Sequence, residues 1–281
     1  MNWNFPSKWK DTVDLNSINF QKIKILEVLG YPHAANQVFA VRGLLDGAEK
    51  TFIIKYKGHV ESNIQNEVNV LSQIHADFVP KIGEYAHDFT YLVTEAIEGE
   101  KLSTIVGENS NCQSLAYMYK FGQMLATLHD FKGSFGNAPH RRFEDLPNEE
   151  YFYKTKLHSI FPYLIANKPA NVNKCFVHGD FHYANVLWKN QQISAVLDFE
   201  LAGIGNKEFD VAWFMILRPG QKFMKSEREL QEFLNGYMST GNCNLEYVKY
   251  YMALIYARFI QFGDDEYEDF IRKWYKDNLL T

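Results

Sequence analysis

The sequence has few cysteines, no long hydrophobic run and no excess of positive charge. Its three cysteines, Cys112, Cys175 and Cys243, are scattered and lack metal-binding spacing, which predicts reduced thiols in a cytoplasmic protein. The apolar run 211–217 is too short to cross a membrane, and residues 1–6 do not resemble the start of a signal peptide. The formal net charge of −5 disfavours a nucleic-acid partner.

Internal repeats, low-complexity tracts and long polar tails are also missing from the sequence. The chain has 281 residues, of which 46% are hydrophobic. A chain of this size buries roughly 75% of its unfolded surface, either in one large domain or in two lobes.

One segment, 177–187, contains the residue types that phosphoryl transfer needs. A His-Gly-Asp triplet ends at Asp180, Asn185 follows five residues later, and an Asp-Phe-Glu triplet begins at Asp198, behind a second apolar run. Asp180 can orient an acceptor hydroxyl, while Asn185 and Asp198 offer the oxygen ligands that Mg²⁺ prefers. His178 is expected to hydrogen-bond the nearby backbone and to fix the shape of the loop.

The same segment has two other interpretations. In a polar turn between two strands, Asp180 and Asn185 would satisfy local backbone groups, but such a turn does not account for Asp198. The spacing of His178 and His182 also occurs in zinc hydrolases, where both histidines lie on a helix and a glutamate follows the first. Here a glycine follows the first histidine, so phosphoryl transfer is the better interpretation.

The His-Gly-Asp-x-x-x-x-Asn element and the downstream Leu-Asp-Phe-Glu resemble the aminoglycoside phosphotransferase and choline kinase family. The resemblance implies an α+β, two-lobed protein-kinase-like fold. Residues 1–97 would form a small antiparallel-sheet N-lobe that binds nucleotide, and residues 98–281 a mainly helical C-lobe that binds the acceptor. It also implies transfer of the γ-phosphoryl of ATP, with GTP as a possible donor, to a small-molecule hydroxyl with the help of Mg²⁺.

The stretch after Asp198 separates two kinds of kinase. Only eleven residues lie between Asp198 and Asp210, and no Ala-Pro-Glu element follows, whereas a protein kinase has a long activation segment there. The chain therefore looks like a small-molecule kinase. Asp210 is expected to start the next helix and to brace the catalytic loop from behind, or simply to cap that helix.

A single lysine, Lys55, ends an apolar strand and could contact the nucleotide phosphates. The following segment, 61–75, has apolar residues at helical spacing, and Glu67 lies beside that stripe. We therefore expect an ion pair between Lys55 and Glu67, as in kinases. Asn66 and Glu61 are weaker candidates for this partner, and Glu67 could also lie on a solvated face of the helix.

Two further segments are candidates for nucleotide binding. A loop that begins at Gly30 is poor in glycine, but Asn36 matches an asparagine in the looser loops of related small-molecule kinases. The strand that ends near Glu95 corresponds to the hinge of the resembled fold. There the backbone groups of Glu95 and Ile97 would bind adenine.

The acceptor has several candidates. In the resembled family, carboxylates of the helical C-lobe hold polyamine sugars. The acidic run at 264–269 therefore makes Asp264, Asp265 and Glu266 candidate contacts for an aminoglycoside-like acceptor. The same run suits a capped helix start. A metabolite kinase for choline, ethanolamine, homoserine or a sugar is an alternative, and a catalytically silent nucleotide-binding protein is another. The sequence does not distinguish resistance from metabolism, and it does not indicate the oligomeric state.

Overall fold

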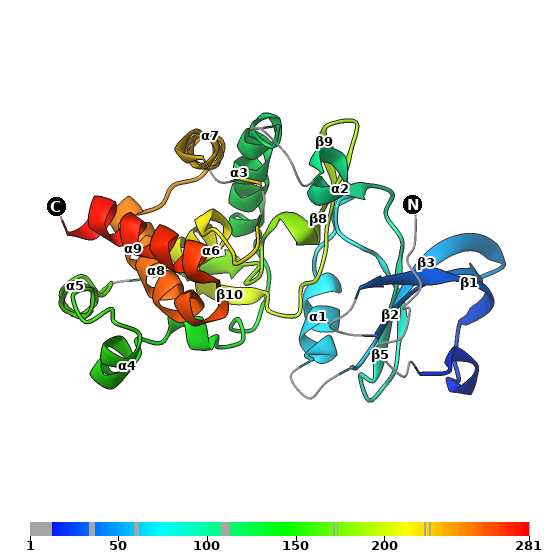
Figure 1. Cartoon of the computed structure of the whole chain (residues 1–281). Coiled ribbons are helices and arrows are strands. Elements are labelled where there is room, and N and C mark those ends of the chain that lie inside the picture. Colours follow the sequence, from blue (N-terminus) through cyan, green and yellow to red (C-terminus); the bar gives the residue numbers. More distant parts are fainter. Residues whose placement is uncertain are drawn as a thin grey trace. The chain divides into compact units, whose positions relative to one another are not determined.

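A computed structural model of the chain describes residues 13–33, 37–58, 62–107, 113–170, 172, 174–221, 223–224 and 226–280 (Figure 1). The chain divides into two compact units. The first comprises Met1–Lys101, Gly133–Phe135 and Asn185–Ala202, and the second comprises Leu102–Lys132, Gly136–Ala184 and Gly203–Thr281. The predicted division after residue 97 stays a prediction about domains, and the compact units differ from it chiefly in residues 185–202.

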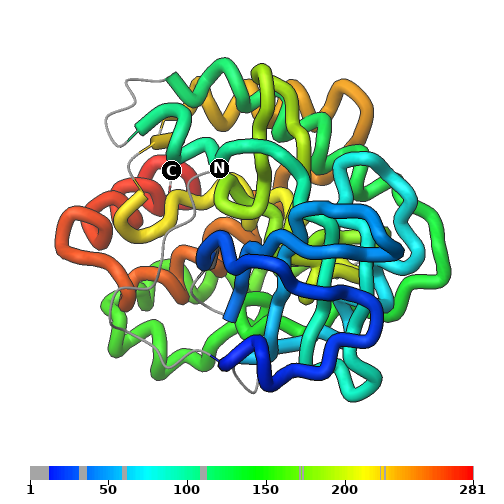
Figure 2. The backbone as a smooth tube through the Cα atoms, turned by 90° about the vertical axis from the view of Figure 1, so that its right-hand side faces the viewer, coloured from blue at the N-terminus to red at the C-terminus, as the bar shows by residue number. Residues whose placement is uncertain are grey.

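The first unit contains a five-stranded antiparallel sheet in the order β1-β2-β3-β5-β4, whose strands run side by side in Figure 2. Asp46 and Gly47 join β2 to β3 with positive φ angles of 51° and 80°, which a two-residue hairpin of this kind requires. The strands are β1 Ile23–His33, β2 Gln37–Leu45, β3 Ala48–Tyr56, β4 Ile82–Tyr85 and β5 Tyr91–Glu95.

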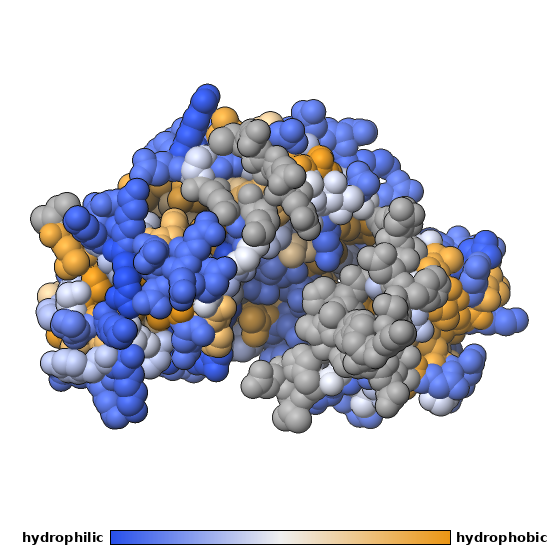
Figure 3. Space-filling view, in the orientation of Figure 1, coloured by the Kyte–Doolittle hydropathy of each residue, from blue (hydrophilic) through white to orange (hydrophobic). Residues whose placement is uncertain are grey.

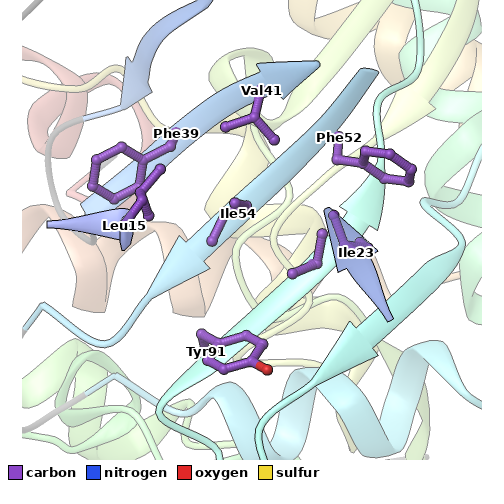
Figure 4. Close-up of a cluster of buried hydrophobic side chains, with 8 residues drawn as sticks. Leu15, Ile23, Phe39, Val41, Phe52, Ile54 and Tyr91 are labelled. Atoms are coloured by element: carbon purple, nitrogen blue, oxygen red, sulfur yellow. The ribbon is translucent and has the colours of Figure 1, made fainter. Parts of the chain in front are cut away.

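A hydrophobic cluster covers one face of this sheet (Figure 4). On β2, β3 and β5 its residues stand two positions apart, so that their side chains point to the same face. This alternation explains why the apolar residues of the strands gather on one side. The cluster consists of Leu15, Ile23, Phe39, Val41, Phe52, Ile54, Tyr91 and Val93.

Helix α1, Ile64–Leu71, follows β3 in the first unit. It is shorter than the predicted 61–75 because the side chain of Asn63 accepts a hydrogen bond from the Asn66 amide and caps the helix. A three-stranded sheet contains β6 Glu100–Lys101, β8 Val186–Lys189 and β9 Gln192–Val196. These elements position the residues around Lys55 and Asp198.

The second unit is mainly helical, with one small ribbon formed by β7 and β10. Helices α3 and α7 pack so closely that a Cβ atom at Gly122 or Gly236 would collide with the backbone of the opposite helix. Glycine at both positions permits this approach. The elements are α2 Leu102–Val106, α3 Leu115–His129, α4 Glu149–Lys154, α5 Phe161–Ala166, β7 Lys174–Val177, β10 Gly203–Asn206, α6 Lys207–Met215, α7 Glu227–Met238, α8 Leu245–Phe259 and α9 Asp265–Leu279. Short 3₁₀ helices lie at Leu15–Ser17, Arg142–Glu144, Tyr183–Asn185 and Ile260–Phe262.

These elements confirm the predicted α+β class, with an antiparallel-sheet N-lobe and a mainly helical C-lobe. The residues that face the viewer on the C-terminal helices are largely hydrophilic (Figure 3). Within the described residues, every helix is too short or too polar to cross a membrane.

Candidate active site

Lys55 and Glu67 form a buried ion pair in the first unit. Strand β3 carries Lys55, helix α1 carries Glu67, and Lys55 Nζ lies 2.6 Å from Glu67 Oε2. The other carboxylate oxygen of Glu67 accepts a hydrogen bond from the Phe199 amide at 3.2 Å. The Glu67 side chain is only 6% exposed, so it does not lie on a solvated helix face. Asn66 instead donates to the carbonyls of Glu200 and Ala202, and Glu61 lies outside the described residues.

Three carboxylates surround the ammonium group of Lys55. Besides the contact with Glu67, its Nζ lies 2.9 Å from Asp198 Oδ1 and 3.4 Å from Glu200 Oε1. Burial lowers the pKa of Lys55, but the charges of Glu67, Asp198 and Glu200 outweigh burial and hold this pKa above its usual value. Burial raises the pKa of Glu67 to about 7, against the opposing charge of Lys55. A charged lysine and adjacent oxygen ligands are suited to polyphosphate and a divalent cation.

Asp198 is the most accessible of the three carboxylates. Its side chain is 37% exposed, compared with 6% for Glu67 and 13% for Glu200. Its backbone has a φ of 66°, in the left-handed region that few residues other than glycine adopt. The buried Phe199 follows directly and anchors this turn. Among the described residues, the carboxylates of Glu67, Asp198 and Glu200 form a group close enough to hold a metal ion.

Asn185 belongs to the same unit as Asp198. It ends the 3₁₀ helix Tyr183–Asn185 and is 8% exposed. Its backbone carbonyl accepts a hydrogen bond from the Leu197 amide at 2.8 Å, one residue before Asp198. The hairpin of β8 and β9 therefore connects the two predicted metal ligands, and their joint role in binding Mg²⁺ stays a prediction.

Asp180 lies in the second unit, among hydrogen-bond donors and positive charges. The indole Nε1 of Trp213 donates to its Oδ1 at 2.7 Å, and His182 Nε2 lies 3.5 Å from its Oδ2. Burial alone would raise the pKa of Asp180. The hydrogen bond from His182 and the charges of His182, Arg141 and Arg218 outweigh burial and hold this pKa well below its usual range. Asp180 is therefore an ionised hydrogen-bond acceptor and a weak base.

Asp210 braces the loop that carries Asp180. Its carboxylate accepts hydrogen bonds from the amides of His178 at 2.9 Å and Gly179 at 3.0 Å. His178 Nδ1 in turn accepts a hydrogen bond from the Asp180 amide at 3.3 Å. The side chain of Asn206, not Asp210, caps helix α6. Asp210 thus holds the backbone of the loop from helix α6.

The zinc interpretation receives no support from the described residues. The only group of His, Cys, Asp and Glu side chains in them that could hold a metal contains no histidine. His178 is fully buried, and His182 uses its Nδ1 to accept a hydrogen bond from the Ala184 amide. Both imidazoles therefore serve the loop around Asp180.

Three further candidates, Glu95, Ile97 and Asn36, were predicted to bind the nucleotide. The Glu95 side chain binds Lys50 at 2.6 Å, and its amide donates to the Lys81 carbonyl, so only its carbonyl is available to a base. Ile97 is half-buried, and Asn36 lies outside the described residues. Nucleotide binding by these three residues therefore stays a prediction.

The acidic run near the C-terminus begins helix α9. The side chain of Asp264 accepts a hydrogen bond from the Tyr267 amide and caps this helix, while Asp265 and Glu266 are exposed in its first turn. Acidic side chains at the N-terminus of a helix interact favourably with the helix dipole. The structure thus supplies a local reason for the acidic run, and a role in acceptor binding stays a prediction.

Sequence reasoning did not identify four residues of these clusters. Glu200 was visible in the Asp-Phe-Glu triplet, but its proximity to Lys55 was not predicted. Trp213, Arg141 and Arg218 approach Asp180 through tertiary packing, and no local pattern connects them. Arg141 precedes Asp180 by 39 residues, and Arg218 follows it by 38.

Comparisons with known proteins agree on one family and one fold. The family model described as "Phosphotransferase enzyme family" matches residues 33–241. No curated protein matches the chain. The solved complex of gentamicin with APH(2″)-IIa has 15% identity and a TM-score of 0.57, and covers 97% of this chain and 98% of that chain. The choline kinase LicA from Streptococcus pneumoniae has 15% identity and a TM-score of 0.59, with coverages of 92% and 94%.

A third similar structure is macrolide 2′-phosphotransferase MphH from Brachybacterium faecium. It has 14% identity and a TM-score of 0.53, and covers 89% of this chain and 90% of that chain. At such low identities the likeness shows the fold alone. It confirms the protein-kinase-like fold that the sequence predicted.

Proposed function

Because the chain belongs to the phosphotransferase enzyme family and is a small-molecule kinase, we propose that it transfers the γ-phosphoryl group of Mg-ATP to a hydroxyl of a small acceptor. The observation that carries this proposal is the position of Lys55. Its ammonium group lies 2.6 Å from Glu67 and 2.9 Å from Asp198. A buried, permanently charged lysine beside a partly exposed carboxylate suits the binding of a metal–polyphosphate complex.

Glu67 orients Lys55 toward the donor phosphates, and its own burial keeps this orientation fixed. Asn185 and Asp198 would hold Mg²⁺, because their amide and carboxylate oxygens are suitable ligands and the Asp198 side chain is 37% exposed. When bound, Mg²⁺ neutralises part of the charge on the phosphates of the donor. GTP is a possible donor, because a hinge recognises the base mainly through backbone groups.

Asp180 accepts a hydrogen bond from the acceptor hydroxyl and aims its oxygen at the γ-phosphorus. The new bond joins the hydroxyl oxygen to phosphorus, the bond between phosphorus and the β,γ-bridging oxygen breaks, and ADP leaves. The hydroxyl proton passes through Asp180 to solvent. Because its neighbours keep the pKa of Asp180 low, its main contribution is orientation of the hydroxyl. Most of the acceleration then comes from positioning and from charge stabilisation.

The names of similar structures suggest acceptors for a first panel. They name gentamicin, a macrolide and choline. The sequence favours an aminoglycoside-like acceptor on the basis of the acidic residues at 264–266. These residues begin helix α9, which gives them a local structural role. A metabolite kinase for choline, ethanolamine, homoserine or a sugar is therefore an equal candidate. A cytoplasmic location is part of the proposal, and the free thiols of Cys175 and Cys243 accord with it.

The test is Mg²⁺-dependent release of ADP from ATP across a panel of acceptors, with Asp180→Asn as the control. The panel contains gentamicin, a macrolide, choline, ethanolamine, homoserine and ribose. Release that an acceptor stimulates, and that the variant loses, supports the proposal. If Mg-ATP binds but no acceptor stimulates release, the protein is a nucleotide-binding relative without turnover on these classes. Failure to bind Mg-ATP contradicts the proposal.

A further inference from the structure

Two arginines lie beside the carboxylate that would orient the acceptor. The guanidinium carbon of Arg141 lies 3.6 Å from the centroid of the Trp213 ring, and that of Arg218 lies 5.1 Å from it. The indole N–H of the same ring donates to Asp180 at 2.7 Å. Arg141 Nη2 is also 4.0 Å from Asp180 Oδ1. Two positive charges are thus held within reach of the predicted acceptor position.

Among the described residues, few partners are found for the hydrogen-bond donors of these arginines. Each guanidinium has five N–H donors. In the part of the chain that the structure describes, Arg141 donates to the Gly179 carbonyl, and Arg218 donates to the Trp213 carbonyl at 3.1 Å. The nearest ion pair is the 4.0 Å contact of Arg141 with Asp180, and Arg218 has none within 4.0 Å among these residues. The remaining donors can bind a ligand.

The arginines are partly buried and held in position. The Arg141 side chain is 10% exposed, and burial lowers the pKa of both guanidinium groups without neutralising them. Trp213 is itself fixed between Phe143 and Phe259, whose ring centroids lie 5.3 and 5.7 Å away. Partly desolvated guanidiniums on a fixed aromatic platform bind carboxylate and phosphate groups strongly, because little side-chain freedom is lost.

From this arrangement, and resting on the function proposed above, we infer that the acceptor carries an anionic group, carboxylate or phosphate, which binds Arg141 and Arg218 while Asp180 orients its hydroxyl. A cationic acceptor is disfavoured for two reasons. Its ammonium groups would be repelled by the two guanidiniums, and a quaternary ammonium would compete with Arg141 for the face of Trp213. The substrate class is therefore a small hydroxy acid or a sugar phosphate.

The first experiment compares related acceptors with and without an anionic group. The pairs are D-glycerate with glyceramide and ribose 5-phosphate with ribose, while gentamicin and choline represent cations. We expect kcat/KM for the better anionic acceptor to exceed that of its neutral partner by about 10- to 100-fold. The carboxylate and phosphate pairs distinguish the two anionic groups. A cationic or neutral acceptor with the highest kcat/KM would overturn the inference.

The second experiment uses variants. Arg218→Met is the sharper one, because among the described residues its guanidinium donates to the carbonyl of Trp213 alone, whereas Arg141 supports the loop at Gly179. Arg218→Met should reduce the ratio of anionic to neutral kcat/KM by about tenfold or more. The matched control is Arg228→Met, on the exposed face of helix α7, which should leave the ratio unchanged. An unchanged ratio in Arg218→Met contradicts the inference.

A binding measurement separates this inference from the proposed function. Calorimetric titration of the full chain with D-glycerate, and separately with inorganic phosphate, needs neither nucleotide nor turnover. Binding that Arg218→Met weakens about tenfold, and that Arg228→Met leaves unchanged, supports the anion site even if no acceptor reacts. If phosphate alone binds and anionic acceptors are not preferred, the arginines serve the transferred phosphoryl group and the acceptor assignment is wrong. If neither anion binds in the wild type, the inference also fails.

Discussion

The indole N–H of Trp213 donates to Oδ1 of Asp180 over 2.7 Å. This bond connects the acceptor-orienting carboxylate to helix α6, the same helix from which Asp210 holds the amides of the loop. One helix therefore fixes both the backbone and the side chain of the predicted catalytic residue. Reactions that depend on positioning are sensitive to such supports, because a small displacement of the carboxylate misaligns the hydroxyl.

Trp213→Phe tests this support. The substitution keeps an aromatic ring on helix α6 but removes the N–H donor. A hydrogen bond to a charged group is worth about 1.5–3 kcal/mol, so kcat should fall by about 10- to 100-fold. Affinity for Mg-ADP should stay the same, because Trp213 belongs to the second unit and Lys55 to the first. Steady-state kinetics and nucleotide titration measure the two quantities.

The matched control is Trp274→Phe, in helix α9, where the indole ring contacts Tyr256 and Tyr275. It removes the same N–H group from a different part of the second unit and should leave kcat within about twofold. Equal losses in the two variants would show that the effect of Trp213→Phe is a general loss of packing.

Glu67→Gln tests the ion pair with Lys55. The variant keeps the side-chain volume and removes one of the three carboxylates around a buried ammonium group. Because Asp198 and Glu200 remain, the loss in unfolding free energy should be about 1–3 kcal/mol, below the usual cost of a broken buried pair. Lys55 should then turn toward the remaining carboxylates, and KM for ATP should rise by about tenfold. Urea unfolding and ATP titration measure these changes.

A surface pair of the same unit serves as the control for Glu67→Gln. Lys189 lies 2.5 Å from Glu98, but these side chains are 55% and 80% exposed. Glu98→Gln should change the unfolding free energy by less than about 1 kcal/mol and should not alter KM for ATP. A similar rise of KM in both variants would contradict the role assigned to Glu67.

The Lys55–Glu67 pair was predictable because both residues follow local patterns. Lys55 ends an apolar strand, and the helical spacing of residues 64, 68, 71 and 74 placed Glu67 beside the buried stripe. The α+β class was predicted differently, because the family resemblance of the His-Gly-Asp and Asp-Phe-Glu segments implied the whole two-lobed fold.

The surroundings of Asp180 were not predictable for a physical reason. Arg141 and Arg218 are 39 residues before and 38 residues after it, and tertiary packing around Trp213 brings the three together. The acidic run shows that one local pattern can suit two roles, because Asp264 caps helix α9 as one interpretation expected, while the acceptor role of the run stays a prediction. In both cases the residue types indicated a kind of chemistry, whereas the position of each side chain could be known only from the folded chain.

Asp198→Asn tests the predicted metal site. Asparagine tolerates the left-handed backbone at this position, with its φ of 66°, so the variant should fold. Loss of the charged oxygen should weaken Mg²⁺-dependent binding of ADP by about 100-fold or more. Binding of ADP in the presence of a chelator should be the same in wild type and variant. Titrations with and without Mg²⁺ measure this difference, and equal Mg²⁺ dependence in both proteins would contradict the assignment of Asp198.

The lowered pKa of Asp180 predicts how stability depends on pH. Since this pKa is lower in the folded chain than the unfolded value of about 3.9, ionised Asp180 stabilises the fold at neutral pH. The contribution is complete above the unfolded pKa and is lost as the pH falls through the folded pKa. Asp180→Asn removes it and leaves Arg141 and Arg218 without their carboxylate. The variant should therefore be less stable by about 1–3 kcal/mol near pH 7.

This difference in unfolding free energy should stay constant from about pH 8 to about pH 5 and should shrink below about pH 4. Urea unfolding at each pH measures it. Asp130→Asn is the control, because Asp130 and its partner Lys132 are 85% and 80% exposed and such surface pairs contribute little at any pH. A difference for Asp180→Asn that grew toward acid would mean that burial, and not the nearby arginines, dominates its ionisation. The case for an anionic acceptor beside these arginines would then lose its electrostatic support.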